Sequence, residues 1–255
     1  RGVAIAALTG ATGFLGANVA AMLVESGLRV RATRRGSSSV RHLDDVPAIE
    51  WLDAALDDEP ALARAFAGAD VVFHVAGVAT QTRFTRGQQR AVNVDGTRHV
   101  LAAARRAGVG RFVHTSSVVA CAIAPDDAAP DVDETMPWNF ARFGLDEMYA
   151  RSKRDAELLV LDAARDMDVV VVNPGTMFGP RDAKPSIVVA PPSSSTWAPS
   201  ATPWARRFPT RWRWRSLISG PMPVSGSRPW PRRSPVRTRA ASSITASNTR
   251  SWMTQ

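Results

Sequence analysis

The sequence predicts an α/β fold in which a doubly wound parallel sheet carries helices on both of its faces. Between residues 3 and 173, short apolar runs alternate with amphipathic stretches. The runs are rich in valine, as in Val169-Val-Val-Val172, and continuous runs of this kind are typical of strands that are covered on both faces. Strands that alternate with helices along the chain pair in parallel, so we expect one parallel sheet.

The elements follow one another in a regular order. Short apolar runs predict strands, and longer stretches with apolar residues three and four positions apart predict helices. The expected strands are residues 3–8, 28–33, 49–52, 70–75, 111–115 and 169–173. The expected helices are residues 14–26, 60–66, 89–107 and 145–166.

The turn between the first strand and the first helix has the sequence Thr9-Gly-Ala-Thr-Gly-Phe-Leu-Gly16, with glycines at positions 10, 13 and 16. Glycine permits a tight turn, lets backbone amides approach a pyrophosphate, and allows the helix to pack closely on the strand. The helix N-terminus then faces the bound anion. Because the loop joins a first strand to a first helix, it predicts dinucleotide binding. The alternative is ordinary turn chemistry.

The end of the second strand indicates which dinucleotide binds. An Asp or Glu about twenty residues after the glycine loop would bind the adenosine ribose and exclude a 2′-phosphate. This chain instead has Arg34 and Arg35, followed by Gly36 and serines at positions 37–39. Guanidinium groups and hydroxyls are donors for a phosphate dianion, so we favour NADP(H), with NAD(H) as the alternative. A solvated basic loop would have the same composition.

Tyr149 is the only tyrosine in the chain, and it stands four residues before Lys153, one of only two lysines. This spacing puts both side chains on one face of a helix. A phenol keeps its proton until about pH 10, so it needs a nearby cation to act as an acid or base at neutral pH. The pair therefore predicts acid-base catalysis, with a surface tyrosine stacked on a lysine stem as the alternative.

Charge divides the chain into two parts. Residues 1–185 contain all 23 acidic residues and 21 of the 32 basic ones, which gives a net charge of −2, whereas residues 186–255 contain 11 arginines and no acid. Six of the eight tryptophans also lie in the second part, beside prolines and serines. We therefore expect a dinucleotide-binding domain with the catalytic residues at 1–185, and at 186–255 a tail that is disordered or frameshifted.

The remaining composition narrows the class of protein. A single cysteine, Cys121, rules out an internal disulfide and suits a reducing compartment. No apolar run approaches the roughly 18 residues of a membrane span, and the first apolar run is too short for a signal peptide. We expect a soluble cytoplasmic protein, and a fragment, because the chain starts without methionine. No metal site is expected, because the four histidines lack ligand spacing: His42, His74, His99 and His114.

Further motifs accompany the glycine loop and the tyrosine-lysine pair. They are His74-Val-Ala-Gly77, Asn93-Val-Asp-Gly-Thr97, His114-Thr-Ser-Ser117 and Asn173-Pro-Gly-Thr-Met-Phe-Gly-Pro-Arg181. With these motifs in order, the chain up to about residue 180 resembles the extended short-chain dehydrogenase/reductase family, of the NAD-dependent epimerase/dehydratase-like type. The arginines and the Thr-Ser-Ser sequence are most similar to dihydroflavonol reductase-like and 3-beta-hydroxysteroid dehydrogenase-like members. The resemblance implies a Rossmann fold.

The resemblance also implies a role for each matching residue. Ser117 would hydrogen-bond the substrate oxygen, with Ser116 and Thr115 less favoured. Tyr149 would transfer the proton, and Lys153 would hold the nicotinamide ribose hydroxyls and lower the pKa of the phenol. The implied cofactor-binding residues are Gly10, Thr12, Gly13, Phe14, Leu15, Gly16, Arg34, Arg35, Leu56, Val75, Ala76, Gly77, Thr115, Tyr149, Lys153 and Pro174.

Two positions leave alternatives open. Asn93 would steady its helix and a water near the lysine, or bond to backbone as a buried asparagine does. Where the family has an Asp-Leu pair beside the adenine amine, this chain has Ala55-Leu56. Asp53 or Asp57 would compensate, or the Leu56 backbone would hold the adenine alone.

The resulting hypothesis is an NADP(H)-dependent oxidoreductase that reduces a carbonyl or oxidises a secondary alcohol of a small molecule by hydride transfer. A NAD-dependent nucleotide-sugar epimerase or dehydratase uses the same serine, tyrosine and lysine and is the first alternative. A non-catalytic dinucleotide-binding protein, or the inactive product of a frameshifted gene, is the second. No membrane partner is expected, and a homodimer stays open.

The tail departs from the family, which would supply a smaller substrate-binding domain there. A segment of 70 residues without an acid is hard to reconcile with a globular surface, and a GC-rich gene read in a shifted frame would produce such a composition. An arm that binds nucleic acid or an anionic membrane is the rival interpretation, because arginine contacts phosphates and tryptophan stacks on bases. Before the tail, the loop Met136-Pro-Trp-Asn139 is expected to cover the active site, or merely to pack.

Overall fold

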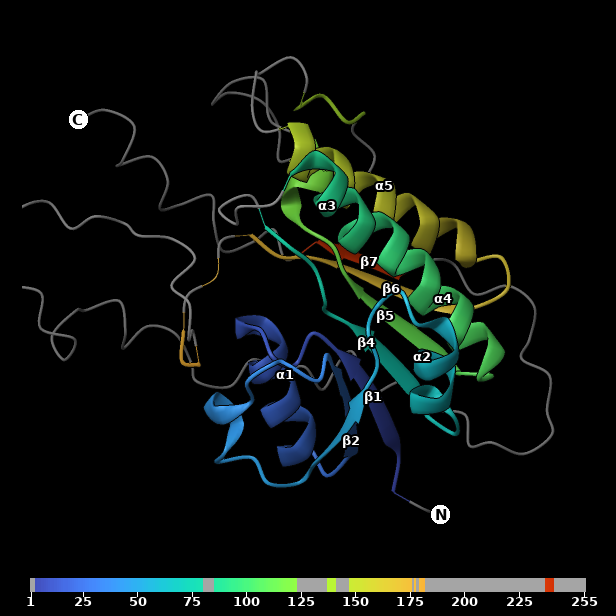
Figure 1. Cartoon of the computed structure of the whole chain (residues 1–255). Helices are drawn as coiled ribbons and strands as arrows, with labels where there is room; N and C mark the ends of the chain where they lie inside the picture. The colour runs from blue at the N-terminus through green and yellow to red at the C-terminus, as the bar shows by residue number, and fades with distance from the viewer. Residues whose placement is uncertain are drawn as a thin grey trace, which may run out of the picture.

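The computed structural model of the 255-residue chain describes residues 3–79, 85–122, 137–140, 147–175, 177, 179–181 and 237–240. Within these residues, one parallel sheet has the strand order β3-β2-β1-β4-β5-β6-β7, and helices lie on both of its faces (Figure 1). The predicted doubly wound parallel sheet is therefore confirmed. The strands are β1 (Ile5–Thr9), β2 (Arg29–Arg34), β3 (Ile49–Asp53), β4 (Val71–His74), β5 (Arg111–Thr115), β6 (Asp168–Asn173) and β7 (Arg237–Ala240).

The strand order reverses beside β1. The chain runs from β1 through β2 to β3 at one edge, and then returns to β4, which pairs with the other side of β1. In open parallel sheets, the crevice outside the carboxyl ends of the strands at such a reversal binds ligands. The glycine loop after β1 and the His74-Val-Ala-Gly77 segment after β4 both lie at this point.

β7 is the part of residues 186–255 that the structure describes. It pairs in parallel with β6, from the Val170–Arg237 pair to the Asn173–Ala240 pair. The rest of the tail lies outside the described residues, and with it the hypotheses of a disordered, frameshifted or nucleic-acid-binding segment. The predicted division after residue 185 stays a prediction.

Helix α1 packs on one face of the sheet, and α2, α4 and α5 pack on the other (Figure 1). The helix expected to begin at residue 89 begins three residues earlier, because Thr85 and Gln88 form a capping box with reciprocal bonds of 3.3 and 2.9 Å. A π-helical turn (Ala91–Asp95) interrupts this helix. The helices are α1 (Phe14–Glu25), α2 (Glu59–Phe66), α3 (Arg86–Arg90), α4 (Gly96–Arg106) and α5 (Glu147–Ala163), with 3-10 turns η1 (Arg41–Leu43) and η3 (Val118–Ala120).

Two apolar clusters hold the three layers together. One cluster lies between the sheet and α1 and includes Leu23 and Val30. The other lies between the sheet and α2, α4 and α5, where Phe66 and Phe112 are fully buried. Each buried side chain of this size contributes about 1.5–3 kcal/mol, so both faces of the sheet stabilise the site that its carboxyl edge carries.

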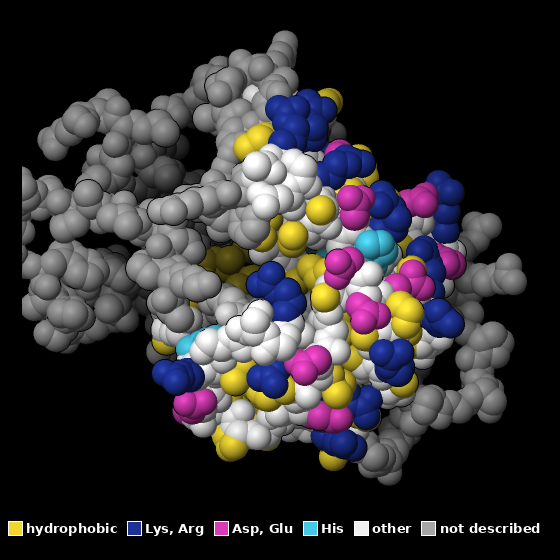
Figure 2. All heavy atoms as spheres, viewed as in Figure 1, with side chains coloured by type: hydrophobic (Ala, Val, Ile, Leu, Met, Phe, Trp, Pro, Cys, Tyr) yellow, Lys and Arg dark blue, Asp and Glu magenta, His cyan; other side chains and the backbone are white. Residues whose placement is uncertain are grey.

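The surface of the described part has mixed charge. Figure 2 shows basic and acidic side chains interspersed over the face that carries α2 and α4, as expected from the small net charge of residues 1–185. No helix in the described ranges is both long enough and apolar enough to cross a membrane.

Candidate functional site

The glycine loop follows β1 and packs so closely against neighbouring backbone that a Cβ atom at Gly10 or Gly16 would clash. Gly10 has a φ of +80°, and a Cβ atom there would lie 2.5 Å from the backbone nitrogen of Ala76, after β4. A Cβ atom on Gly16 would overlap the carbonyl group of Gly10. Gly10 is therefore needed for its backbone conformation, and Gly16 for the close contact between helix and loop.

The N-terminus of α1 is left without a side-chain cap. Its N-cap residue, Gly13, offers no side-chain hydrogen bond, and the first turn contains no acidic residue. In contrast, Asp58 caps α2 by accepting a hydrogen bond of 2.9 Å from the Ala61 amide, and Glu59 adds a negative charge. The amides and the positive dipole end of α1 suit a phosphate. The glycine cradle and the open helix end thus fit the pyrophosphate of a dinucleotide.

A row of buried polar side chains crosses the sheet near its carboxyl edge. Thr33, Thr9, His74 and His114 are neighbours in register on β2, β1, β4 and β5, and each is at most 4% exposed. His114 points to the face covered by α4 and α5, because Phe112, two residues earlier, packs there. The sequence did not predict this row, because its members stand within or beside apolar runs.

Hydrogen bonds fix the tautomer of His74. Thr97 donates its hydroxyl proton to the Asn93 carbonyl at 2.6 Å, so its oxygen accepts from His74 Nε2 at 2.9 Å. His74 Nδ1 is then an acceptor for the Thr9 hydroxyl at 2.8 Å. Thr9 in turn accepts from the Ala76 amide at 3.3 Å. This chain of bonds joins the segment after β4 to α4 through the sheet.

Burial keeps the two histidines of the row neutral. Burial, and to a smaller extent the charge of Lys153, lowers the pKa of His74 to about 3. The pKa of His114 falls well below its ordinary value, first through burial and then through the charges of Lys153 and His74. The two rings lie 5.3 Å apart. Within the part of the chain that the structure describes, neither ring nitrogen of His114 has a hydrogen-bond partner.

Ser117 and Tyr149 meet at the carboxyl end of β5. Ser117 is 8% exposed, and its hydroxyl accepts a bond of 3.4 Å from the Val119 amide at the start of η3. Tyr149 lies in the first turn of α5. Burial raises the pKa of its phenol, and the nearby Ser117 side chain lowers it to a smaller extent. The structure thus brings together the residues expected to bind and protonate a substrate oxygen.

Lys153 lies one turn beyond Tyr149 and is 6% exposed. Its ammonium group donates to the Thr115 carbonyl at 2.7 Å. Burial lowers the pKa of Lys153 to about 8, whereas the charge of Glu157 raises it. The expected effect of Lys153 on the phenol is not visible in the pKa of Tyr149, which responds to burial and to Ser117.

Asn93 stands in the π-helical turn and joins three elements. Its side-chain oxygen accepts from the Val78 amide at 2.8 Å, and its nitrogen donates to the Val78 carbonyl at 3.0 Å and to the Ser152 hydroxyl at 2.9 Å. Ser152 donates to the Tyr149 carbonyl at 2.8 Å. Of the two expected roles, the structure displays bonding to backbone. Asn93 pins the segment after β4 to the start of α5.

Sequence reasoning assigned no role to two residues of this region, Glu157 and Asn173, although Asn173 begins one of the motifs. Asn173 ends β6, and its side-chain amide donates to the Ser117 carbonyl at 3.0 Å and to the Glu157 carboxylate at 2.7 Å. Glu157 stands on α5, four residues after Lys153, and is 6% exposed. Repeating the four-residue step that links Tyr149 to Lys153 would have found it.

The end of β2 carries the arginines expected to select the cofactor. Arg34 donates to Asp53, the last residue of β3, at 3.2 Å, and its guanidinium lies 5.8 Å from the centre of the Trp51 ring. Arg35 is exposed. Asp53 is thus the carboxylate that the structure brings to this edge, where the sequence offered Asp53 or Asp57 as compensation for the missing family aspartate.

The segment after β6 crosses to the glycine-loop side of the sheet. The Pro180 carbonyl accepts from Asn18 of α1 at 2.9 Å, and Arg181 forms a two-pronged pair with Asp45, after η1, with both distances 2.6 Å. Pro174 begins this segment, and its carbonyl accepts from the Val118 amide at 3.1 Å. The other expected cofactor residues lie at the same carboxyl edge: Thr12, Phe14 and Leu15 around the start of α1, Leu56 after β3, and Val75 and Gly77 after β4.

The loop expected to cover the active site packs against η3. The indole of Trp138 donates to the Val119 carbonyl at 3.0 Å, stacks on Phe140 at 5.9 Å, and lies 5.6 Å from the Arg151 guanidinium. Met136 lies outside the described residues. Packing is therefore observed for Trp138, and a covering role stays a prediction.

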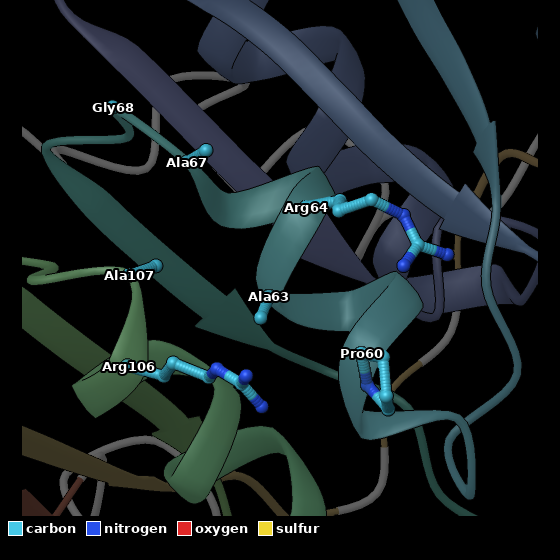
Figure 3. Close-up of a pocket in the computed structure, with 7 residues that line it drawn as sticks. All are labelled: Pro60, Ala63, Arg64, Ala67, Gly68, Arg106 and Ala107. Atoms are coloured by element: carbon cyan, nitrogen blue, oxygen red, sulfur yellow. The ribbon is translucent and has the colours of Figure 1, made fainter.

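A shallow depression lies elsewhere on the surface, between α2 and the end of α4 (Figure 3). Its walls come from residues that precede β4 and β5, so it opens at the amino edge of the sheet, opposite Ser117 and Tyr149. Residues 123–136 and 141–146, which flank the catalytic candidates, lie outside the described residues. We therefore do not assign the depression to the active site. It is lined by Pro60, Ala63, Arg64, Ala67, Gly68, Arg106 and Ala107.

Comparisons with known proteins agree with this geometry. Residues 6–191 match the NAD dependent epimerase/dehydratase family. Sterol demethylase protein B of Methylococcus capsulatus is 38% identical over 182 residues, which are 71% of this chain and 54% of that protein. A 3 beta-hydroxysteroid dehydrogenase/Delta 5→4-isomerase of Mycobacterium tuberculosis is 34% identical over 183 residues, which are 69% of this chain and 47% of that protein.

A solved structure of a related enzyme has a similar fold. Vestitone reductase from alfalfa matches with a TM-score of 0.56 and 28% identity, over 66% of this chain and 56% of that one. The chain spans about half the length of the curated relatives it matches. These findings confirm the resemblance to extended short-chain dehydrogenases/reductases. With the glycine loop, the strand order and a family match over most of its length, this chain belongs to the NAD-dependent epimerase/dehydratase family.

Proposed function

We propose that the chain is an NADP(H)-dependent oxidoreductase that interconverts a carbonyl and a secondary alcohol of a small molecule by hydride transfer. The observation that carries this proposal is that the Ser117 side chain lies near enough to Tyr149 to lower the pKa of its phenol, one helical turn from the buried Lys153. A phenol beside a hydroxyl and one turn from an ammonium group is suited to protonate a carbonyl oxygen.

The chemistry divides between cofactor and protein. A reduced dinucleotide whose pyrophosphate the glycine loop would hold would supply, from its nicotinamide, the hydride for the carbonyl carbon. Ser117 donates a hydrogen bond to the carbonyl oxygen and orients it toward Tyr149. Tyr149 gives its phenolic proton to that oxygen, and the ammonium of Lys153 stabilises the phenolate that remains. Because the pKa of Lys153 is about 8, most of this lysine is charged at neutral pH.

The preference for NADP(H) rests on the end of β2. The exposed guanidinium of Arg35 suits a two-pronged contact with a 2′-phosphate. Arg34 is held in place by Trp51 and by Asp53, which also offsets part of its charge. Asp53 is the observation that favours a second candidate, a NAD-dependent epimerase or dehydratase, because a carboxylate near the adenosine ribose would repel a 2′-phosphate.

Fluorescence titration of the purified chain with NADPH and, separately, with NADH tests the cofactor preference. We expect NADPH to bind at least about tenfold more tightly, a difference of about 1.4 kcal/mol. Arg35→Ala should remove most of that difference and leave NADH binding unchanged. Arg165→Ala is the matched control, because its guanidinium is exposed just after the end of α5. Tighter binding of NADH would favour the NAD-dependent candidate, and binding of neither would contradict both.

Tyr149→Phe tests the chemistry. With NADPH and a panel of aldehydes and ketones, the variant should lose at least about 100-fold in kcat, because it keeps the ring but has no proton to transfer. Its NADPH affinity should match that of the parent chain. Turnover that survives this substitution would contradict the proposed role of Tyr149.

Location, assembly and domain organisation belong to the same proposal. We expect the enzyme to act in the cytoplasm on a small carbonyl or hydroxyl compound, and a homodimer would be detected by light scattering.

Sequencing the coding DNA tests the frameshift hypothesis for residues 186–255. A second frame that continues with acidic, amphipathic sequence would support it, and the lack of one would contradict it.

A further inference from the structure

Two charged side chains are buried in the described part of the chain, and both lie on α5. Lys153 and Glu157 are each 6% exposed, and four residues separate them, so they share one helix face. A buried carboxylate is costly unless hydrogen bonds and opposite charges compensate it. The role of Glu157 therefore needs an explanation beyond that of a surface charge.

The contacts of Glu157 lead to the segment that begins with Ser117. One carboxylate oxygen accepts from Asn173 at 2.7 Å, and the same Asn173 amide donates to the Ser117 carbonyl at 3.0 Å. The other oxygen accepts from Arg154 at 3.2 Å, and Arg154 also donates to the Ala120 carbonyl at 3.3 Å. Asn173 thus links Glu157 to Ser117, at the beginning of the turn, and Arg154 links it to Ala120, at the end of the turn.

We propose that Glu157 is a positioning residue, which holds the Ser117 turn against α5 and keeps Lys153 in its ammonium form. The inference rests on the proposed function for the roles of Ser117, Tyr149 and Lys153. Glu157 acts through these residues and needs no contact with the substrate. One side chain would then set both the geometry of the serine and the charge of the lysine.

The surroundings of Lys153 explain why a countercharge is needed. The ammonium group is bonded to a neutral carbonyl, that of Thr115. His74 from β4 and His114 from β5 interact with its charge, and both are buried and neutral. Burial lowers the pKa of Lys153, and among the causes of its shift Glu157 is the charge that raises it. Without Glu157, the pKa of Lys153 would fall further, and less of the lysine would be charged at neutral pH.

NMR of the full chain labelled with 13C at the lysine Cε tests this inference without any substrate. The chain has only two lysines, Lys153 and Lys184, so two signals are expected, and Lys153→Met assigns them. The Lys153 signal of the parent should titrate near pH 8. In Glu157→Gln, which keeps the shape and an acceptor for Asn173 but loses the charge and the bond from Arg154, the midpoint should fall by about one pH unit.

Two further variants complete the test. Asp162→Asn removes one negative charge from a solvent-exposed position of the same helix, and it should leave the Lys153 midpoint where it is in the parent. Arg154→Gln removes the cation that is paired with Glu157. The carboxylate would then act on Lys153 alone, so the Lys153 midpoint should move upward. This second variant carries the test if Glu157→Gln does not fold. A Lys153 midpoint that neither Glu157→Gln nor Arg154→Gln moves would overturn the inference.

Activity measurements separate this inference from the proposed function. For carbonyl reduction, the loss of kcat at high pH should begin at lower pH in Glu157→Gln than in the parent. A merely structural role would lower kcat by the same factor at every pH and leave the start of that loss unchanged. If the parent shows no turnover that depends on Tyr149, the proposed function fails while the lysine titration still decides the inference.

Discussion

The two faces of the sheet differ at the carboxyl edge. On the face toward α1, the buried side chains of the strands are apolar, with Leu8 and Phe73 among them. The face toward α4 and α5 is apolar at its base, but near the edge it carries His74, His114 and Asn173. The backbone of the glycine loop forms the proposed cofactor cradle, whereas side chains form the proposed catalytic cluster. The fold therefore concentrates buried polar groups, and the cost of burying them, on one face.

Substitutions on the two faces should lower stability for different reasons. On the apolar side, the tight contacts are between backbone atoms, and an added atom has nowhere to go. On the polar side, stability depends on whether each buried donor and acceptor keeps its partner. The following predictions test this difference, in order of their expected effect on the free energy of unfolding.

Gly16→Ala should have the largest effect. The new Cβ atom would overlap the Gly10 carbonyl and lie 2.5 Å from its carbon, so the loop or the helix must shift. We expect a loss of about 3 kcal/mol or more in the free energy of unfolding, measured by urea denaturation. Gly36→Ala is the matched control, because nothing lies within 4 Å of its Cβ position, and it should change stability by less than about 0.5 kcal/mol. Equal effects would contradict the backbone contact.

His74→Leu and His114→Leu compare a bonded with an unbonded member of the polar row. His74→Leu deprives the hydroxyls of Thr9 and Thr97 of their ring partners, so it should cost about 2 kcal/mol at neutral pH. His114→Leu breaks no hydrogen bond within the described residues, so it should cost less than about 1 kcal/mol or stabilise the protein. Denaturation in urea measures both. The reverse order would show that the bonds of His74 do not stabilise the fold.

The acid dependence of stability should follow from the same histidines. Their folded-state pKa values lie below the ordinary value, so the unfolded chain binds more protons at acidic pH. The stability contributed by the neutral ring of His74 is present above about pH 6.5 and is lost as the pH falls toward 3, and that of His114 is lost in the same direction. Each histidine should contribute about 1 kcal/mol per pH unit in this range. His114→Leu should flatten the measured dependence by that amount, and an unchanged slope would contradict the buried neutral state.

How far the sequence predicts the structure depends on whether a feature has a periodic signal. The valine-rich runs predict the strands, and the glycine spacing predicts the loop, because each pattern reflects a local requirement. The π-helical turn at Asn93 has no such signal, since one extra residue in a turn hardly changes an apolar pattern. Glu157 was missed because a charged residue on a helix is usually exposed. His114 lies in a predicted strand, but only the strand register brings it beside His74.

Gly13→Asp should have the smallest effect on the free energy of unfolding. Its main effect should be on cofactor binding. Gly13 has φ and ψ values that any residue adopts, and its Cβ atom would lie 3.4 Å from the Gly10 oxygen. The new carboxylate would cap α1 as Asp58 caps α2, which should add a few tenths of a kcal/mol to the free energy of unfolding. The same charge would occupy the helix end that suits the pyrophosphate, so NADPH binding should weaken by at least about tenfold. Gly13→Ala, which adds neither a cap nor a charge, is the control. Unweakened NADPH binding by Gly13→Asp would mean that the open end of α1 is not where the phosphates bind.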